Sequence, residues 1–397
     1  MLSSYVLAIK NSNIPERLIL IVAFSSLLNP ILSIPIHIGF FIYLFLKDEI
    51  VVLFKSHQLL KWLLIILFVS IGLSLFYGNV VGYLYAIWFL LLVVFTAYCY
   101  HHLNFELSDF ILRHILHFSI YLAIYGCFQY VLSYFIEPNA ITSFTGLDNH
   151  RAIGTFLNAN YYAIMIQFFV LLAIYMLLIG TTQKRMYYLF IIGINLLALL
   201  LTGSRAGLGA VLIGATVLIL LVVPRFIGPF LVFVGSSLTL ITLFVPELLV
   251  RFGSIAAGFL NRNEILFIGL ARFLRNPFFG EGLFTISNVL HPLVRKIKTI
   301  HSHNLFLEPF INFGLIPLIL FFPAYKIFRR DLFVIKNQGG SFYKLTLAFM
   351  VMILVHGTED LPFFIPPFLI LLVILVLGRT PRSYRAEDMN DSTALNP

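Results

Sequence analysis

Long runs of uncharged apolar residues recur along most of this chain and limit what it can fold into. The runs are about 17 to 25 residues long, the length that a helix needs to cross a bilayer. Hydrophobic residues make up 60% of the 397 residues and charged residues 11%, with a mean hydropathy of +0.98, which is too apolar for a soluble domain. Because the runs are continuous and do not alternate with period two, they favour helices over a β-barrel. The predicted fold class is therefore all-α, a polytopic transmembrane helical bundle.

We place twelve predicted spans in a single domain over 1–378, and the first two of them are short. The polar tail at 379–397 is predicted to be disordered and cytoplasmic. Cys99 and Cys127 both fall within predicted spans, where packing is their expected role and neither a disulfide framework nor a metal site is indicated. The predicted spans are 18–29, 33–46, 58–77, 80–100, 110–136, 157–180, 186–202, 206–223, 226–246, 305–328, 341–356 and 362–378.

The positions of the basic residues predict the orientation. Most of the 26 lysines and arginines lie in short loops on the same side as the two termini. Short loops rich in such residues face the cytoplasm, so both termini are predicted to be cytoplasmic. The formal net charge of +9 follows mainly from this topology and does not indicate nucleic-acid binding.

Four polar segments interrupt the apolar runs, at 137–160, 202–207, 247–303 and 356–360. All four fall on the predicted outer face, and the cytoplasmic connections are short. Within the longest segment, residues 262–275 have clustered apolar residues with charges at both ends, which predicts a helix lying in the membrane interface. We therefore expect a site at the outer boundary between membrane and water, covered by one long extracytoplasmic loop with short helices.

Three arginines on this face are candidate ligands for an anionic head group. Arg205 lies in a Thr-Gly-Ser-Arg-Ala-Gly turn, where the glycines allow a close backbone approach. Arg151 follows the neutral polar His150, and Arg262 lies between Asn261 and Asn263. A guanidinium fork suits the oxygens of a phosphate or diphosphate. The alternative is that each arginine is an interfacial anchor, although anchors of the positive-inside kind belong on the opposite face.

The sequence His301-Ser302-His303-Asn304 begins the predicted span at 305–328 and is the candidate catalytic segment. The two histidines are expected to bracket the start of a helix, with Ser302 near its N-cap. A neutral His303 could take a proton from a sugar hydroxyl, and Asn304 and Glu308, one helical turn apart, could orient the base or the acceptor. Metal binding by the two histidines is the alternative, but the sequence offers no evident third ligand.

In this order, these motifs resemble the O-antigen ligase and O-antigen polymerase superfamily of bacterial envelope enzymes. The resemblance rests on TGSRAG at 202–207, a long outer loop, and the His-Asn-x-x-Leu-Glu that begins at His303. The ligase pattern of His-Asn, nine residues and Gly is met by Gly314, while Pro317 departs from its last position. The stretches GTFLNANYYA, Asn-Pro with Gly-x-Gly, and HGTED are also similar, at 154–163, 276–282 and 356–360.

The resemblance implies a GT-C-like membrane enzyme that performs inverting, metal-independent glycosyl transfer at the outer face of the bacterial inner membrane. The donor would be a glycan on undecaprenyl diphosphate, the acceptor lipid A-core or a lipid-linked glycan, and no cofactor is expected. His303 matches the proposed base, and Arg205 and Arg262 match the arginines assigned to the diphosphate, with Arg151 as a further candidate. The residues expected to support them are Asn304, Glu308, Ser204, Asn160 and Asp360.

Ligase and polymerase use similar groups, and the sequence favours a ligase. The chain is compact, has one large outer loop and lacks, in its predicted outer segments, an Arg-x10-Gly match of the sort described in some polymerases. A transporter of small anions or lipid-linked sugars is the alternative from another class. Transporters usually place ionisable groups near the middle of the membrane, whereas the polar residues here collect at one face.

Overall fold

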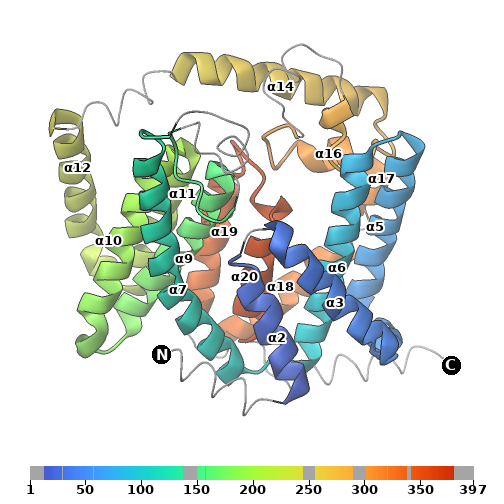
Figure 1. Ribbon diagram of the computed structural model, residues 1–397, viewed down its shortest axis with the longest axis horizontal. Helices are drawn as coiled ribbons and strands as arrows, with labels where there is room; N and C mark the ends of the chain where they lie inside the picture. Colours follow the sequence, from blue (N-terminus) through green and yellow to red (C-terminus); the bar gives the residue numbers. More distant parts are fainter. Residues whose placement is uncertain are drawn as a thin grey trace.

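The computed structural model describes residues 13–28, 30–56, 58–136, 150–156, 158–244, 255–288, 301–319, 321–337 and 341–379. Within these ranges every regular element is a helix. Figure 1 shows most helices standing side by side as an upright bundle, with one long helix, α14 (Ile255–Arg275), lying across its upper end. The all-helical fold predicted from the continuous apolar runs is therefore confirmed for the described residues.

Five helices are long and apolar enough to cross a membrane. Four of them begin at a side-chain cap; for example, Asn79 accepts a hydrogen bond from the Gly82 amide and Asn104 from the Leu107 amide. α9 is the most buried and lies at the centre of the core, with Phe168 and Phe169 fully enclosed. The five are α6 (Val80–His102), α7 (Phe105–Leu132), α9 (Ala159–Ile179), α10 (Arg185–Thr202, continuing the 3₁₀ turn η2 at Thr182–Lys184) and α11 (Arg205–Val222).

Shorter apolar helices complete the bundle, and most coincide with predicted spans. They leave the predicted count of twelve spans undetermined, because several are shorter than the bilayer core requires. These helices are α2 (Ile14–Ser25), α3 (Pro30–Leu46), α5 (Gln58–Phe76), α12 (Ile227–Phe244), α19 (Phe342–His356) and α20 (Pro366–Leu377), with α4 (Glu49–Ser56), η3 (Pro224–Phe226), η4 (Thr285–Asn288) and η5 (Pro362–Phe364) as connections.

The continuous span predicted at 305–328 is wrong. The chain there forms α16 (Glu308–Phe313), α17 (Leu315–Ile319) and α18 (Phe321–Asn337). Gly314 breaks the helix with a φ of +65°, a conformation that glycine adopts without a Cβ clash. The Leu315 and Ile316 amides then donate to carbonyls of the segment after α14, at 2.8 and 2.9 Å. Hydropathy identified the apolar run but could not show that its first part packs against a loop.

The polar segments gather at one end of the bundle, the upper end in Figure 1. Arg151 donates to the Thr202 carbonyl at 2.6 Å, and Nδ2 of the Asn79 side chain donates to the Leu283 carbonyl at 2.6 Å. Parts of two predicted outer segments, residues 137–149, 157, 247–254 and 289–300, lie outside the described residues. The sequence-based grouping of polar segments on one face is thus observed for the described parts.

Basic residues mark the opposite end. Arg379 donates to Asp109 at 3.2 Å and packs its guanidinium 3.9 Å from the centre of the Phe105 ring. Arg113 pairs with the same carboxylate at 2.6 Å, one helical turn away. Apart from Arg379, the predicted tail at 379–397 lies outside the described residues. This distribution is what the positive-inside rule expects of a cytoplasmic end.

α14 carries two apolar faces. Ile265 packs with Ile286 and Ile311 beneath the helix, in a small hydrophobic cluster separate from the main core. Phe267, Leu270 and Leu274 form an exposed stripe at a spacing of three and four residues. The observed helix is longer than the predicted 262–275, and its exposed apolar stripe suits a membrane interface.

Candidate functional site

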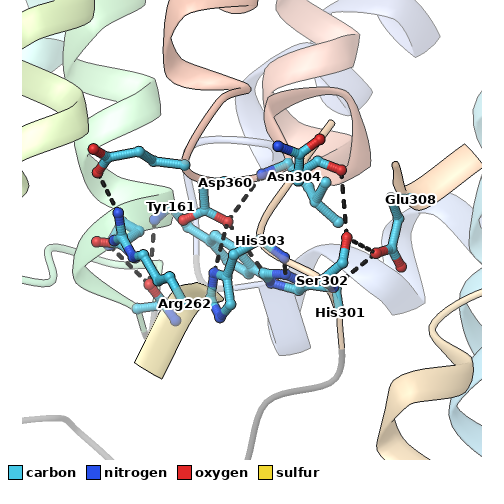
Figure 2. Close-up of polar contacts among 12 residues, drawn as sticks. Tyr161, Arg262, His301, Ser302, His303, Asn304, Glu308 and Asp360 are labelled. Carbon is cyan, nitrogen blue, oxygen red and sulfur yellow. Dashed lines mark hydrogen bonds and ion pairs between the residues drawn. The ribbon is translucent and has the colours of Figure 1, made fainter. Parts of the chain in front are cut away.

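Two histidines and one aspartate meet at the upper end of the bundle, as Figure 2 shows. Nε2 of His301 and Nδ1 of His303 each lie 3.7 Å from Oδ1 of Asp360. The side chains of His301 and Asp360 are almost fully buried, while His303 is 22% exposed. His303 is therefore the member of the cluster that a substrate can reach.

A turn after α19 places Asp360 opposite the histidines. The Glu359 and Asp360 amides both donate to the His356 carbonyl at 3.0 Å, which winds the chain tightly after the helix. The Leu305 amide donates to the Gly357 carbonyl at 2.7 Å and joins this turn to the histidine loop, residues 301–307. Two segments far apart in sequence are thus joined beside the reactive groups.

Hydrogen bonds assign the roles of the imidazole nitrogens. The His303 amide donates to Nδ1 of His301 at 3.1 Å, so that nitrogen carries no proton and Nε2 of His301 bears it toward Asp360. Nδ1 of His303 faces the same carboxylate. A proton on Nδ1 leaves Nε2 of His303 as the basic nitrogen, an arrangement in which the carboxylate orients a general base.

Burial and mutual proximity set the charges of this cluster. Burial alone would raise the pKa of Asp360, but the nearby imidazoles of His303, His301 and His356 hold that pKa well below its usual range. Burial, with a smaller effect of His303, lowers the pKa of His301 to about 3 despite the opposing effect of Asp360. At neutral pH Asp360 is therefore a carboxylate and His301 a neutral imidazole.

The same three side chains form a possible metal site. One ligand atom each from His301, His303 and Asp360 lies within 4.8 Å of the others. Two imidazoles and a carboxylate are a donor set suited to zinc or another transition ion. The sequence offered no evident third ligand beside the histidines, and the fold supplies one from the turn after α19.

Arg262 reaches the same turn from α14. Its guanidinium forms an ion pair with Glu359, and the two side chains are 31% and 42% exposed. Figure 2 shows this arginine near His303 and Asp360. Arg262 therefore lies at the turn that carries Asp360, but it already has a carboxylate partner that an anionic substrate would have to displace.

Arg205 is the first residue of α11. Gly203 ends α10 in the left-handed conformation, with a φ of +62°, and the Ser204 side chain caps α11 by accepting from the Gly207 amide at 3.2 Å. Nη1 of Arg205 is buried and makes no hydrogen bond to any residue within the described ranges. A buried guanidinium N–H without a partner is costly, and an anionic ligand would satisfy it.

Arg151 and Asn160 are engaged with each other and with the protein. Nε of Arg151 donates to the Thr202 carbonyl at 2.6 Å, and Nη2 donates to Oδ1 of Asn160 at 3.1 Å. These bonds tie the loop at 150–156 to the end of α10, next to the Gly203 turn. Arg151 is thus held between the end of α10 and the first turn of α9, and its role as a diphosphate ligand stays a prediction.

The predicted helix start at the histidines is wrong. The helix begins at Glu308, so Ser302 is not its N-cap. Oδ1 of Asn304 instead accepts from the Phe306 and Leu307 amides at 3.0 and 2.9 Å, which closes a local turn. The Glu308 carboxylate reaches back to Ser302. The helix-start prediction failed because the side chains of Asn304 and Glu308 both bond the preceding loop.

A hydrophobic cavity lies directly beside the histidine loop. Its volume is about 360 Å³, and its walls include Leu67 of α5, Phe89 of α6, Leu305 and Phe364. The centre of the Phe284 ring lies 5.5 Å from that of Phe364, a wall residue of this cavity, and 6.1 Å from that of His301. The polar site thus adjoins a space that suits an apolar chain.

Sequence reasoning missed two residues behind the site. The Gln167 side chain bonds Nδ1 of His356 across the core, and both side chains are buried. That ring nitrogen lies 2.7 Å from Nε2 and 3.1 Å from Oε1 of Gln167. The bond joins α9 to α19 just before the Asp360 turn. A lone glutamine within an apolar span was the signal that could have found it, because an amide at that depth needs a partner.

Residues 188–322 match a family model described as O-antigen ligase. The matched segment contains Arg205, Arg262 and His303 and stops before Asp360. Among curated proteins no match is found. The family match confirms the resemblance to the O-antigen ligase and polymerase superfamily that the motifs indicated. With the apolar helices, it supports a membrane-embedded transferase function of the O-antigen ligase kind.

Proposed function

We propose that the protein is a glycosyltransferase that moves a glycan from undecaprenyl diphosphate to an acceptor hydroxyl at the outer face of the bacterial inner membrane. The observation that carries this proposal is the pairing of His303 with Asp360 at the end of the bundle where Arg205 and Arg262 lie. These groups match the needs of the reaction, a base for the acceptor and cations for a departing diphosphate.

His303 acts on the acceptor. Nε2 takes the proton of the acceptor hydroxyl as its oxygen forms a bond to the anomeric carbon from the face opposite the diphosphate. The bond between that carbon and the diphosphate oxygen breaks, and the diphosphate leaves with the electron pair, so the anomeric configuration inverts. Asp360 orients the imidazole and stabilises the positive charge that it gains.

The arginines act on the donor. Nη1 of Arg205, buried and without a bond to the described residues, binds a diphosphate oxygen and stabilises the charge that develops there. Arg262 exchanges its Glu359 partner for the diphosphate when the donor binds. The apolar cavity beside Leu305 holds the part of the lipid chain next to the diphosphate. The donor thus bridges the polar site and the apolar space beside it.

Lipid A-core is the acceptor that we favour, which makes the protein a ligase with its termini in the cytoplasm. The compact chain, its single large outer loop and the lack of an Arg-x10-Gly match in the predicted outer segments favour this over a polymerase. Both enzymes need the same base and cations, so the acceptor must be identified by experiment.

The test uses purified protein in lipid nanodiscs with an undecaprenyl-diphosphate-linked glycan. Lipid A-core and a second lipid-linked glycan are supplied in separate reactions, and products are identified by mass spectrometry. We expect glycosylated lipid A-core, in an amount unchanged by excess EDTA, and a rate of product formation with His303→Ala that is about 10² to 10⁴-fold lower. Polymer alone would assign a polymerase. Counterflow of labelled substrate in proteoliposomes without any glycan product would overturn the proposal in favour of transport.

A metal-dependent reaction is a second candidate because the fold adds Asp360 to the two histidines. In that case the ion would activate the acceptor hydroxyl, and His303 would be a ligand in place of a base. Loss of activity in EDTA, restored by zinc or another divalent ion, would select this mechanism.

A further inference from the structure

Glu308 is the first residue of α16, and its buried carboxylate bonds the loop that precedes the helix. Its side chain has no exposed surface, and α16 runs away from the histidines. Oε2 accepts two hydrogen bonds from Ser302, from the amide at 2.7 Å and from the hydroxyl at 2.5 Å. Figure 2 shows both bonds converging on the residue that separates His301 from His303. The carboxylate therefore binds the histidine loop at its centre.

The backbone at this point needs such support. His303 has a φ of +55°, in the left-handed region that is unfavourable for a residue with a Cβ. A conformation of this kind persists only where the surrounding structure holds it. Ser302 precedes the strained residue and is held by Glu308, and Leu305 follows it and is held by the Gly357 carbonyl at 2.7 Å. Two anchors thus enclose His303.

The left-handed backbone has a direct effect on the imidazoles. It allows the His303 amide to donate back to Nδ1 of His301 while Nδ1 of His303 faces Asp360. A relaxed backbone at His303 would turn its side chain away from that carboxylate. The orientation of the base therefore depends on the Ser302 anchor.

We propose that Glu308 is a positioning residue for glycosyl transfer, which fixes the backbone of His303 through Ser302 and so keeps the imidazole on Asp360. This inference rests on the proposed role of His303 as general base. Glu308 contacts neither donor nor acceptor in this mechanism, and its effect passes through the Ser302 hydrogen bonds.

The burial of Glu308 argues against a role in packing alone. Enclosing a carboxylate is unfavourable, and an apolar side chain would fill the same space at lower free energy. Burial raises the pKa of Glu308 to about 6, and the hydrogen bonds from Ser302 and the nearby His303 limit this rise. The carboxylate therefore occupies an unfavourable buried position in which Oε2 accepts the hydrogen bonds of the histidine loop.

The experiment measures initial rates in nanodiscs for Glu308→Ala, Glu308→Gln, Ser302→Ala and the double variant Glu308→Ala/Ser302→Ala. We expect Glu308→Ala to lower kcat by up to about 10²-fold, as a misplaced catalytic group does, with KM for the lipid donor unchanged. Glu308→Gln keeps an acceptor oxygen and should regain much of the activity. The double variant should be no slower than Glu308→Ala, because both changes remove the same contact.

Glu281→Gln is the matched control, since Glu281 is another buried carboxylate and bonds Arg272, Asn276 and Thr285 away from the histidine loop. It should lower thermal stability without lowering kcat per folded molecule. The inference is overturned if Glu308→Ala keeps the wild-type kcat, if kcat and donor affinity fall together, or if the double variant is additive. His303→Ala separates the two proposals. Full activity of this variant would refute the role of His303 as general base. If His303→Ala is inactive and Glu308→Ala is fully active, only the positioning role of Glu308 is refuted.

Discussion

Nε2 of His303 is the atom on which the proposed chemistry depends. The Asp360 carboxylate faces Nδ1, the other nitrogen of that imidazole. His301 is neutral because of its burial, and its Nδ1 accepts a hydrogen bond from the His303 amide. The three groups therefore have different tasks although they lie within 4.8 Å of one another. At the scale of single residues, the site is a base, its orienting carboxylate and a neutral neighbour.

His303→Ala should lower transfer by about 10² to 10⁴-fold, the usual contribution of acid–base catalysis, while donor binding persists. The arginines hold the diphosphate, so tryptophan quenching or calorimetry with the lipid donor should give a Kd near that of the wild type. His301→Ala should be milder, since His301 orients the loop and takes no proton from the acceptor. Equal loss in both variants, together with inhibition by EDTA, would favour the metal mechanism.

Arg205→Lys should restore little of the activity that Arg205→Ala removes. The ammonium of lysine is a point charge and cannot place two N–H groups on neighbouring diphosphate oxygens. Transfer rates of both variants, at matched amounts of folded protein judged by gel filtration, provide the measurement. Full activity of the lysine variant would reduce Arg205 to a general electrostatic or anchoring role.

At the scale of elements, two glycines allow the backbone at the end of α16 to pack in close contact with the loop that follows α14. A Cβ at Gly314 would lie 2.5 Å from backbone atoms of Phe278 and Phe279, and one at Gly280 would lie 2.5 Å from the Asn312 carbonyl oxygen. Both glycines have positive φ, at +65° and +68°. This close backbone contact keeps the histidine loop beneath α14.

Gly314→Ala should therefore destabilise the protein by about 1–3 kcal/mol or more, the usual cost of a conformation reserved for glycine. Thermal unfolding in detergent measures the effect. Gly193→Ala in α10 is the control, because a Cβ there meets nothing within 4 Å and its φ is not positive. That variant should be neutral or slightly stabilising. Equal stability of Gly314→Ala and wild type would show that this close backbone contact is not required for stability.

At the scale of the whole molecule, polar segments and basic anchors occupy opposite ends of the bundle. The end with Arg205 and His303 should face outward, since short basic loops stay in the cytoplasm. Thr358 lies exposed beside the site, and Thr182 lies exposed in the 3₁₀ turn before α10. In a variant without Cys99 and Cys127, a cysteine at position 358 should react with an impermeant thiol reagent in spheroplasts. One at position 182 should react only after permeabilisation, and the reverse result would place the site in the cytoplasm.

The amino-acid sequence by itself determined the helical class, most helix positions and the grouping of polar segments. Helix formation and membrane insertion depend on local composition, which hydropathy reads directly. The motif around Arg205 and His303 also lies in continuous stretches, so its resemblance to the O-antigen ligase and polymerase superfamily needed no structure.

Only the tertiary structure decided how the site is assembled. The fold brings the Asp360 carboxylate to His303 and pairs Glu359 with Arg262. Gly314 breaks an apolar run because the loop after α14 packs against it. The spacing of Asn304 and Glu308 predicted that they are one helical turn apart. In the structure the Glu308 carboxylate instead accepts a hydrogen bond from the Ser302 amide. These pairings depend on which segments meet in space, and neither spacing nor hydropathy along one chain carries that information. The energy of a buried charge or a strained backbone is decided by its through-space partners.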